Sequence, residues 1–168
     1  MPSLNRAVLT ALAAVLSTAL IASSCGSDQF ELPQEIRDAE DLEARLNRSF
    51  TYADMEIVIA AVQRVDTSEY SSFNDANLRV YIKAKNVGSE TRTFHAWAWT
   101  SVVDSDGVIH SPSLCAGCPK ALDRVEFAPG GEVVGFLYFE MPSGKQADSI
   151  IFKPTFSANA VHVEFSDR

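Results

Sequence analysis

Basic residues are scarce in this sequence. Its 168 residues include 14 Lys and Arg against 22 Asp and Glu, which gives a formal net charge of −8 at pH 7. Proteins that bind nucleic acids or anionic lipid surfaces through charge need basic patches, and this balance does not supply them. We therefore expect no nucleic-acid partner and no attachment to membranes through surface charge.

The motifs of common catalytic and metal sites are also missing. There is no G-x-S-x-G nucleophile elbow, and the three histidines form no H-E-x-x-H or H-x-x-x-H pair. The D-S-D-G stretch at residues 104–107 resembles part of a calcium loop, but Val102 and Ser113 stand where that loop needs acidic ligands. A hairpin turn through Asp-Gly explains the stretch better. We expect no enzymatic activity and no cofactor.

No apolar run is long enough to span a membrane. The longest covers residues 7–21, follows the basic residue Arg6 and ends in the small residues of ASSC, residues 22–25. A spanning helix needs about 20 apolar residues. A basic start, a short apolar run and small residues at its end are instead typical of an export signal. We predict a signal peptide at residues 1–24.

The stretch ASSC resembles the lipobox of bacterial lipoproteins, in which small residues precede a cysteine that is acylated and becomes the first mature residue. The resemblance implies that Cys25 is lipidated and that the protein contacts a bacterial membrane, outside the cytoplasm, through this anchor only. The lipobox prefers leucine where this chain has Ala22, so an ordinary secretory signal is the alternative. Lipidation would leave Cys115 and Cys118 as a pair in an oxidising compartment.

Cys115 and Cys118 have C-x-x-C spacing within SPSLCAGCPK, residues 111–120. A thioredoxin-like redox pair begins a helix after a strand, whereas this pair lies in a Pro-flanked loop between candidate strands. We predict a local disulfide that holds the shape of one loop. The alternative is an extracytoplasmic metal carrier or redox partner that uses Cys115, Cys118 and His110.

Residues 25–49 are predicted to tether the domain to the lipid anchor. From residue 26 to residue 49, ten of 24 residues are charged and seven of these are acidic, a composition that buries little surface. Apolar residues also recur at helical spacing after Pro33, where a helix could begin. A short helix is therefore the alternative to a solvated stalk.

Residues 50–168 show short alternating runs separated by turn signals and are predicted to form one domain. The clearest run is LRVYIKAKN, residues 78–86, in which apolar and polar residues alternate as in a strand with one dry face. The candidate strands are Met55–Val65, Leu78–Asn86, Thr93–Val103, Gly107–His110, Arg124–Phe127, Glu132–Met141, Ser149–Lys153 and Ala160–Phe165. Seven or eight such strands predict an all-β fold, an antiparallel β-sandwich.

The turns and strands together resemble a known family. The stretches KNVGSETRTF, VVDSDGVIH, FAPGGEVVGFLYFEMP and DSIIFKP are similar, in this order, to the immunoglobulin-like domain of uncharacterised bacterial lipoproteins, which is related in fold to the mycobacterial immunoprotective extracellular antigen. The matching positions are Asn86, Gly88, Asp104, Asp106, Gly107, Pro129, Gly130, Glu132, Gly135, Phe139 and Pro142. The LCAGC loop and Gly131 depart from the pattern. The resemblance implies an immunoglobulin-like sandwich and, because the family has no assigned activity, at most a surface-exposed interaction domain.

Aromatic residues supply the candidate binding site. In TFHAWAWTSVV, residues 93–103, strand alternation places Trp97 and Trp99 on one face and Val102 on the other. Since the family register implies that Val102 points into the core, both tryptophans are expected on the outer face of the sheet.

The same analogy leaves Phe136 and Tyr138 on the outer face of the later strand. Together with the tryptophans they would form a platform for a glycan, a peptide or a partner domain. The alternatives are a bulge that turns Trp97 and Trp99 into the core, or residues 26–49 lying over them. We therefore predict a surface-anchored bacterial lipoprotein that acts as a non-enzymatic binding or adaptor module of the cell envelope, with an envelope protein or glycan as its candidate partner.

Overall fold

The computed structural model describes residues 32, 34–37, 42–66, 77–115, 117–154 and 159–166. In chain order these residues form α1 (Gln34–Arg37), β1 (Leu42–Tyr52), β2 (Met55–Arg64), β3 (Leu78–Asn86), β4 (Arg92–His95), α2 (Ala96–Trp99), β5 (Thr100–Asp104), β6 (Ile109–His110), β7 (Arg124–Phe127), β8 (Glu132–Phe139), β9 (Ala147–Phe152) and β10 (Val161–Glu164). The predicted signal peptide and Cys25 lie outside the described residues. None of the described helices is long and apolar enough to cross a membrane.

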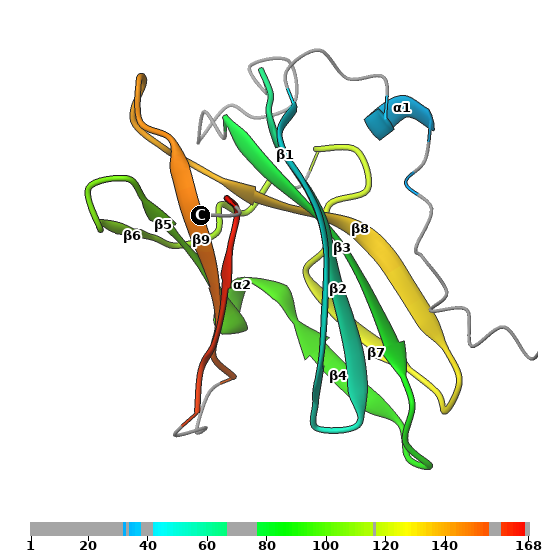
Figure 1. The fold of residues 1–168 in the computed structure, drawn as a ribbon. Coiled ribbons are helices and arrows are strands. Elements are labelled where there is room, and N and C mark those ends of the chain that lie inside the picture. The colour runs from blue at the N-terminus through cyan, green and yellow to red at the C-terminus, as the bar shows by residue number, and fades with distance from the viewer. Residues whose placement is uncertain are drawn as a thin grey trace, which may run out of the picture.

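The strands form an antiparallel β-sandwich (Figure 1). One sheet has the order β1-β2-β3-β8 and the other β10-β9-β5-β6, while β4 and β7 pair as a two-stranded ribbon. Neighbouring strands pair antiparallel in all three sheets. The predicted fold class is confirmed, because the elements form two layers of antiparallel strands around a main core.

The main core lies between the two four-stranded sheets and follows the period-2 pattern of the strands. Leu78, Val80 and Ile82 of β3 are at most 2 % exposed and face Val102 of β5 and Ile150 of β9 across the shared core. Val102 is 0 % exposed, as the family register implied. The alternation in β3 therefore identified the core-facing residues.

β1 begins within the predicted tether, eight residues before the predicted domain start at residue 50. It pairs with β2 along its whole length, and Leu46, Phe50 and Tyr52 pack against the main core. These three residues share the face that alternation assigns to even-numbered positions. The charged residues between them lower the mean hydropathy of the segment. Its composition therefore predicted a solvated stalk where the structure has a strand.

Candidate binding cleft at the disulfide loop

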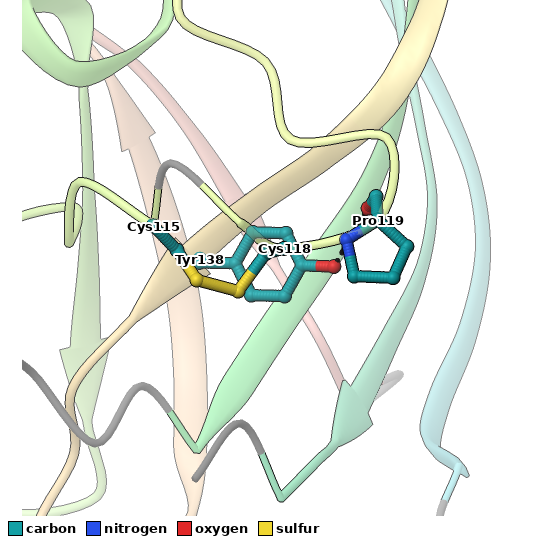
Figure 2. Close-up of a disulfide and its surroundings, with 4 residues drawn as sticks. All are labelled: Cys115, Cys118, Pro119 and Tyr138. Atoms are coloured by element: carbon teal, nitrogen blue, oxygen red, sulfur yellow. Dashed lines mark hydrogen bonds between the residues drawn. A yellow bond between two sulfur atoms is a disulfide. The ribbon is translucent and has the colours of Figure 1, made fainter. Parts of the chain in front are cut away.

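The disulfide loop, defined as residues 111–123, is closed by a bond between Cys115 and Cys118 (Figure 2). Their Cα atoms lie 5.3 Å apart, and the Cys118 N–H donates to the Cys115 carbonyl at 3.1 Å. Both cysteines are buried. This geometry matches a local disulfide that holds one loop in shape.

The backbone of this loop lies along β8, which is an edge strand of its sheet. The Ser113 N–H donates to the Tyr138 carbonyl at 2.7 Å, and the Phe136 N–H donates to the Lys120 carbonyl at 2.9 Å. The Leu122 N–H completes the set by donating to the Phe136 carbonyl at 2.8 Å. An open strand edge invites pairing with other chains, and here the loop occupies part of it.

Phe136 and Tyr138 lie beneath this loop, so the predicted surface platform of four aromatic residues is wrong. They do point away from the main core, but they are only 2 % and 3 % exposed. They form a second apolar cluster with Tyr81 and the two cysteines, and the Tyr138 hydroxyl donates to the Pro119 carbonyl at 2.8 Å (Figure 2). The disulfide loop thus covers the outer face of β8, which becomes part of a second apolar cluster.

Two further residues explain how this face is covered. Gly135 permits the close approach of the loop, because a Cβ atom there would lie 2.5 Å from the Lys120 carbonyl oxygen. A glycine inside a strand often marks such an approach, so Gly135 is a signal in the sequence that another segment covers this strand. Leu32 also packs against the cluster and so helps to cover the outer face.

A helical turn, α2, interrupts the predicted strand 93–103 and separates the two tryptophans. Trp97 is 52 % exposed, whereas Trp99 is half-buried and packs edge-on against Phe94 and Phe152 with ring centroids 5.9 Å apart in each case. The expectation that both lie on the outer face is therefore wrong for Trp99. A helical turn rotates successive side chains by about 100° rather than 180°, so strand alternation fails here.

The turn that carries Trp97 is fixed at both ends. The Thr100 hydroxyl donates to the Ala96 carbonyl at 2.7 Å, and Ala96 is completely buried. The Ala96 N–H donates to the Asp123 carbonyl at 3.0 Å, which joins the turn to the disulfide loop. Trp97 is thus held in a defined position beside the loop, although its indole is open to solvent.

A cavity of about 530 Å³, here called the Trp97 cleft, lies between this turn and the disulfide loop. Trp97 and Leu114, which is 65 % exposed, line it together with Lys120, Asp123 and the buried Tyr138. Its size falls within the range of small-ligand sites, roughly 300–1,000 Å³. Of the predicted platform, the cleft retains Trp97 at its surface and Tyr138 as a buried lining residue.

Leu114, Lys120 and Asp123 were not singled out from the sequence. Leu114 stands next to Cys115, and a large apolar residue in a loop between strands was a usable signal. Nothing in the local pattern indicated that Asp123 would meet the Trp97 turn, because that contact joins residues 27 positions apart through backbone hydrogen bonding.

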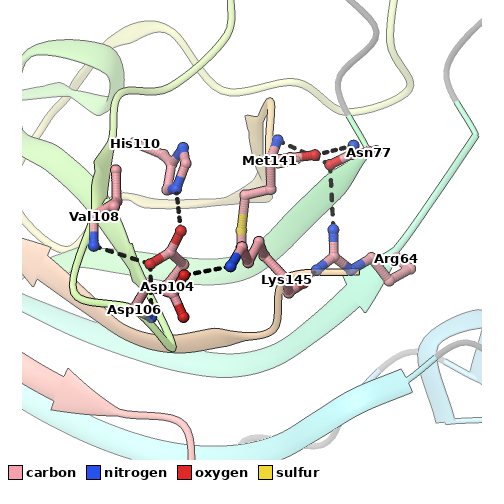
Figure 3. A network of polar contacts seen from close by, with 8 residues as sticks. All are labelled: Arg64, Asn77, Asp104, Asp106, Val108, His110, Met141 and Lys145. Atoms are coloured by element: carbon pink, nitrogen blue, oxygen red, sulfur yellow. Dashed lines mark hydrogen bonds and ion pairs between the residues drawn. The ribbon is translucent and has the colours of Figure 1, made fainter. Parts of the chain in front are cut away.

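His110 belongs to a different cluster, at the β5–β6 hairpin (Figure 3). Its Nε2 lies 2.9 Å from Oδ2 of the buried Asp104, whose Oδ1 accepts the N–H groups of Asp106 and Val108 at 2.9 Å each. The contact with His110 and then the Val108 bond hold the pKa of Asp104 below its ordinary value of 3.8. The carboxylate thus holds the hairpin turn through these hydrogen bonds.

The alternative metal site of Cys115, Cys118 and His110 does not assemble in the part of the chain that the structure describes. The two sulfur atoms bond to each other, and His110 pairs with Asp104. The described residues contain no group of three or more His, Cys, Asp or Glu side chains placed to hold a metal ion. What the Trp97 cleft offers is contact area and hydrogen-bonding groups.

Solved structures share this fold at low sequence identity. The yjhA protein from Bacillus subtilis has a TM-score of 0.54 and 12 % identity, and the match covers 73 % of this chain and 99 % of that one. The secreted protein MPT63 from Mycobacterium tuberculosis has a TM-score of 0.56 and 12 % identity, with 67 % and 88 % covered. A putative lipoprotein, ycdA, from Bacillus subtilis has a TM-score of 0.51 and 15 % identity, with 78 % and 40 % covered.

At these identities the likeness shows the fold alone. No curated protein matches the sequence. The likeness to MPT63 agrees with the predicted relation to the mycobacterial antigen. A family described as Domain of unknown function (DUF4352) matches residues 44–161, more than half of the chain. The protein therefore belongs to the DUF4352 family.

Proposed function

We propose that the protein is a non-enzymatic binding module of the bacterial cell envelope, which holds a ligand or partner in the Trp97 cleft. The observation that carries this proposal is the position of Trp97. Its indole is 52 % exposed, yet it stands on a turn fixed by two hydrogen bonds at the wall of a cavity. A large apolar ring kept in water at a defined place is typical of a binding contact.

The cleft is also preorganised. Its far wall, with Leu114, is fixed by the disulfide at Cys115 and by the bond from Ser113 to β8. Binding to a rigid site costs less conformational entropy than binding to a mobile loop. Tryptophan lowers the entropic cost of binding further, because it provides a large contact area with only two side-chain torsions. Both walls of the cleft, the Trp97 turn and the disulfide loop, therefore hold their contact groups in place before a ligand binds.

The proposed location rests on independent observations. The first 25 residues resemble a lipoprotein export signal, and a disulfide persists best outside the cytoplasm. Two proteins of the same fold are described as a secreted protein and a putative lipoprotein. We propose that Cys25 carries the lipid anchor and that the sandwich lies outside the cytoplasm.

Metabolic labelling tests the anchor. The full chain, expressed in a bacterial host fed an alkyne-bearing fatty acid, is expected to incorporate label and to sediment with membranes. The variant Cys25→Ser is expected to lose the label, since serine carries no thiol for acylation. Equal labelling of both proteins would exclude Cys25 as the lipidation site.

Binding to isolated cell envelopes tests the module. The lipid-free protein, lacking residues 1–25, is added to envelopes, and the bound fraction is measured against protein concentration. Saturable binding that Trp97→Ala weakens is the expected result. Val87→Ala is a matched control, because Val87 is also 52 % exposed but does not line the cleft. Binding that is equally strong for Trp97→Ala would remove the cleft from the function.

A further inference from the structure

We infer that the ligand of the Trp97 cleft is a neutral carbohydrate, with one sugar ring stacked on the indole of Trp97. This inference rests on the proposed binding function and names the class of its ligand. Both the composition of the cleft and the chain segments around it point to a sugar.

The cleft combines an exposed aromatic face with polar groups. The face of an indole carries partial negative charge and attracts the C–H groups that line one side of a pyranose ring. Asp123 is exposed, and its carboxylate forms no hydrogen bond or ion pair with any residue that the structure describes. A carboxylate accepts hydrogen bonds from hydroxyl groups, which sugars present in abundance. Ser113 and Lys120 add further polar lining.

An extended peptide fits this cleft less well. Peptides that bind as an added β-strand need the free backbone groups of a sheet edge. Along β8 beside the cleft, the N–H of Phe136 and the carbonyls of Phe136 and Tyr138 already bond to the disulfide loop. Strand addition there would have to displace the loop.

An amphipathic helix also fits less well. Helix-binding grooves accommodate apolar anchors spaced over about two turns, and therefore present a long apolar surface. Trp97 and Leu114 are the exposed large apolar side chains among the described residues that line the cleft. A short apolar surface flanked by polar groups suits a single ring with hydroxyl groups better than a helix.

Charge favours a neutral sugar over an acidic one. The chain has a formal charge of −8, and in the cleft Lys120 and Asp123 carry opposite charges. An anionic polysaccharide would meet the repulsion of the whole protein with little local compensation. A neutral glycan avoids this cost.

Titration of the lipid-free protein with neutral hexasaccharides tests the inference. The probes are oligomers of glucose, mannose, galactose and N-acetylglucosamine, and binding is measured by saturation-transfer NMR and calorimetry. At least one probe is expected to bind and to shift the fluorescence of Trp97. Trp97→Ala is expected to weaken binding by about tenfold or more, as for other tryptophan anchors.

Three further variants separate the contacts. Trp97→Phe keeps an aromatic face and should retain more affinity than Trp97→Ala. Asp123→Asn should weaken binding several-fold, because a charged acceptor forms stronger hydrogen bonds than a neutral one. Val87→Ala should bind as the wild type does. If no probe binds, or if Trp97→Ala binds equally well, the carbohydrate inference is wrong.

The two proposals fail separately. Trp97-dependent binding to envelopes without binding of any hexasaccharide would refute the carbohydrate ligand and leave the binding function standing. A photo-crosslinking residue at position 114 would then identify the class of the true partner. Absence of both kinds of binding would overturn both proposals.

Discussion

The disulfide loop and the β5–β6 hairpin, residues 104–110, differ in the contacts that hold them. A covalent bond, backbone hydrogen bonds to β8 and a buried aromatic floor hold the disulfide loop. The hairpin depends on the Asp104 carboxylate, and its Asp106 forms an ion pair with Lys145 (Figure 3). Reductant should therefore loosen the first, whereas acid and salt should loosen the second. The Trp97 cleft is lined by the disulfide loop, so acid and salt should loosen the cleft less than they loosen the hairpin.

The hairpin network continues to the far end of β2. Arg64 donates to the Lys145 carbonyl, and its second nitrogen donates to Oδ1 of Asn77 at 3.3 Å (Figure 3). The same Asn77 oxygen accepts the N–H of Met141 at 3.0 Å. The polar contacts thus connect several turns at one end of the sandwich, while the backbone hydrogen bonds of the disulfide loop join it to β8 and, through Asp123, to the turn that carries Trp97.

Removing the floor of the disulfide loop should have the largest effect. Phe136→Ala is expected to lower the free energy of unfolding by about 3–5 kcal/mol, because it leaves a cavity beneath a buried aromatic cluster. Phe136 contacts Tyr81 at a centroid distance of 5.0 Å, and the guanidinium of Arg79 lies 4.2 Å above its ring. Urea denaturation measures the loss, and Phe136→Leu should cost less. A loss no larger than that of Val87→Ala would show that this face is not a second core.

Opening the disulfide should have a smaller effect. Cys115→Ala with Cys118→Ala is expected to cost about 2 kcal/mol, because the closed loop is short and restricts the unfolded chain little. Hydrogen exchange should increase at residues 113–122 and remain unchanged in the hairpin. Exchange that increases equally in both regions would contradict their independence.

Acid should loosen the hairpin before the cleft. Because the pKa of Asp104 is lowered in the folded state, its contribution is complete above the unfolded value, near 3.8, and is lost as the pH falls below that value through the folded pKa. The amide resonance of Val108 should report this titration by NMR. Asp104→Asn should remove it. The amides of Ser113 and Leu122 in the disulfide loop should not follow the same titration. A shared midpoint would show that the loop and the hairpin do not respond to acid independently.

Breaking the ion pair between Asp106 and Lys145 should have the smallest effect. Both side chains are partly exposed, so solvent and salt screen their attraction. The hydrogen bond to Asp106 nevertheless raises the pKa of Lys145 above its ordinary value. Because the attraction is screened, Lys145→Met should lower the melting temperature only slightly at low salt and not at all at high salt. A loss that persists at high salt would indicate a structural role beyond charge.

The elements predicted best from the sequence are those whose local pattern agrees with their environment. β3 and β7 have the predicted bounds, because each alternating run ends at a turn. The core position of Val102 followed from the family register. Local periodicity thus sufficed wherever one face of a strand meets the main core.

The remaining features depend on contacts between distant segments. The burial of Phe136 and Tyr138 results from a loop that lies across them, which alternation within β8 cannot show. The separation of Trp97 from Trp99 results from a single helical turn of four residues, too short to have a readable period. Gly135 was the one local signal of close approach that could have been used.

Envelope binding by Trp97→Ala shows whether the protein holds its partner through the Trp97 cleft. The dissociation constant of the lipid-free protein for isolated envelopes is measured for the wild type, Trp97→Ala and Val87→Ala, with folding of each checked by thermal denaturation. If the cleft holds the partner, Val87→Ala should bind as the wild type does and Trp97→Ala about tenfold or more weakly. Equal dissociation constants for all three folded proteins would contradict it.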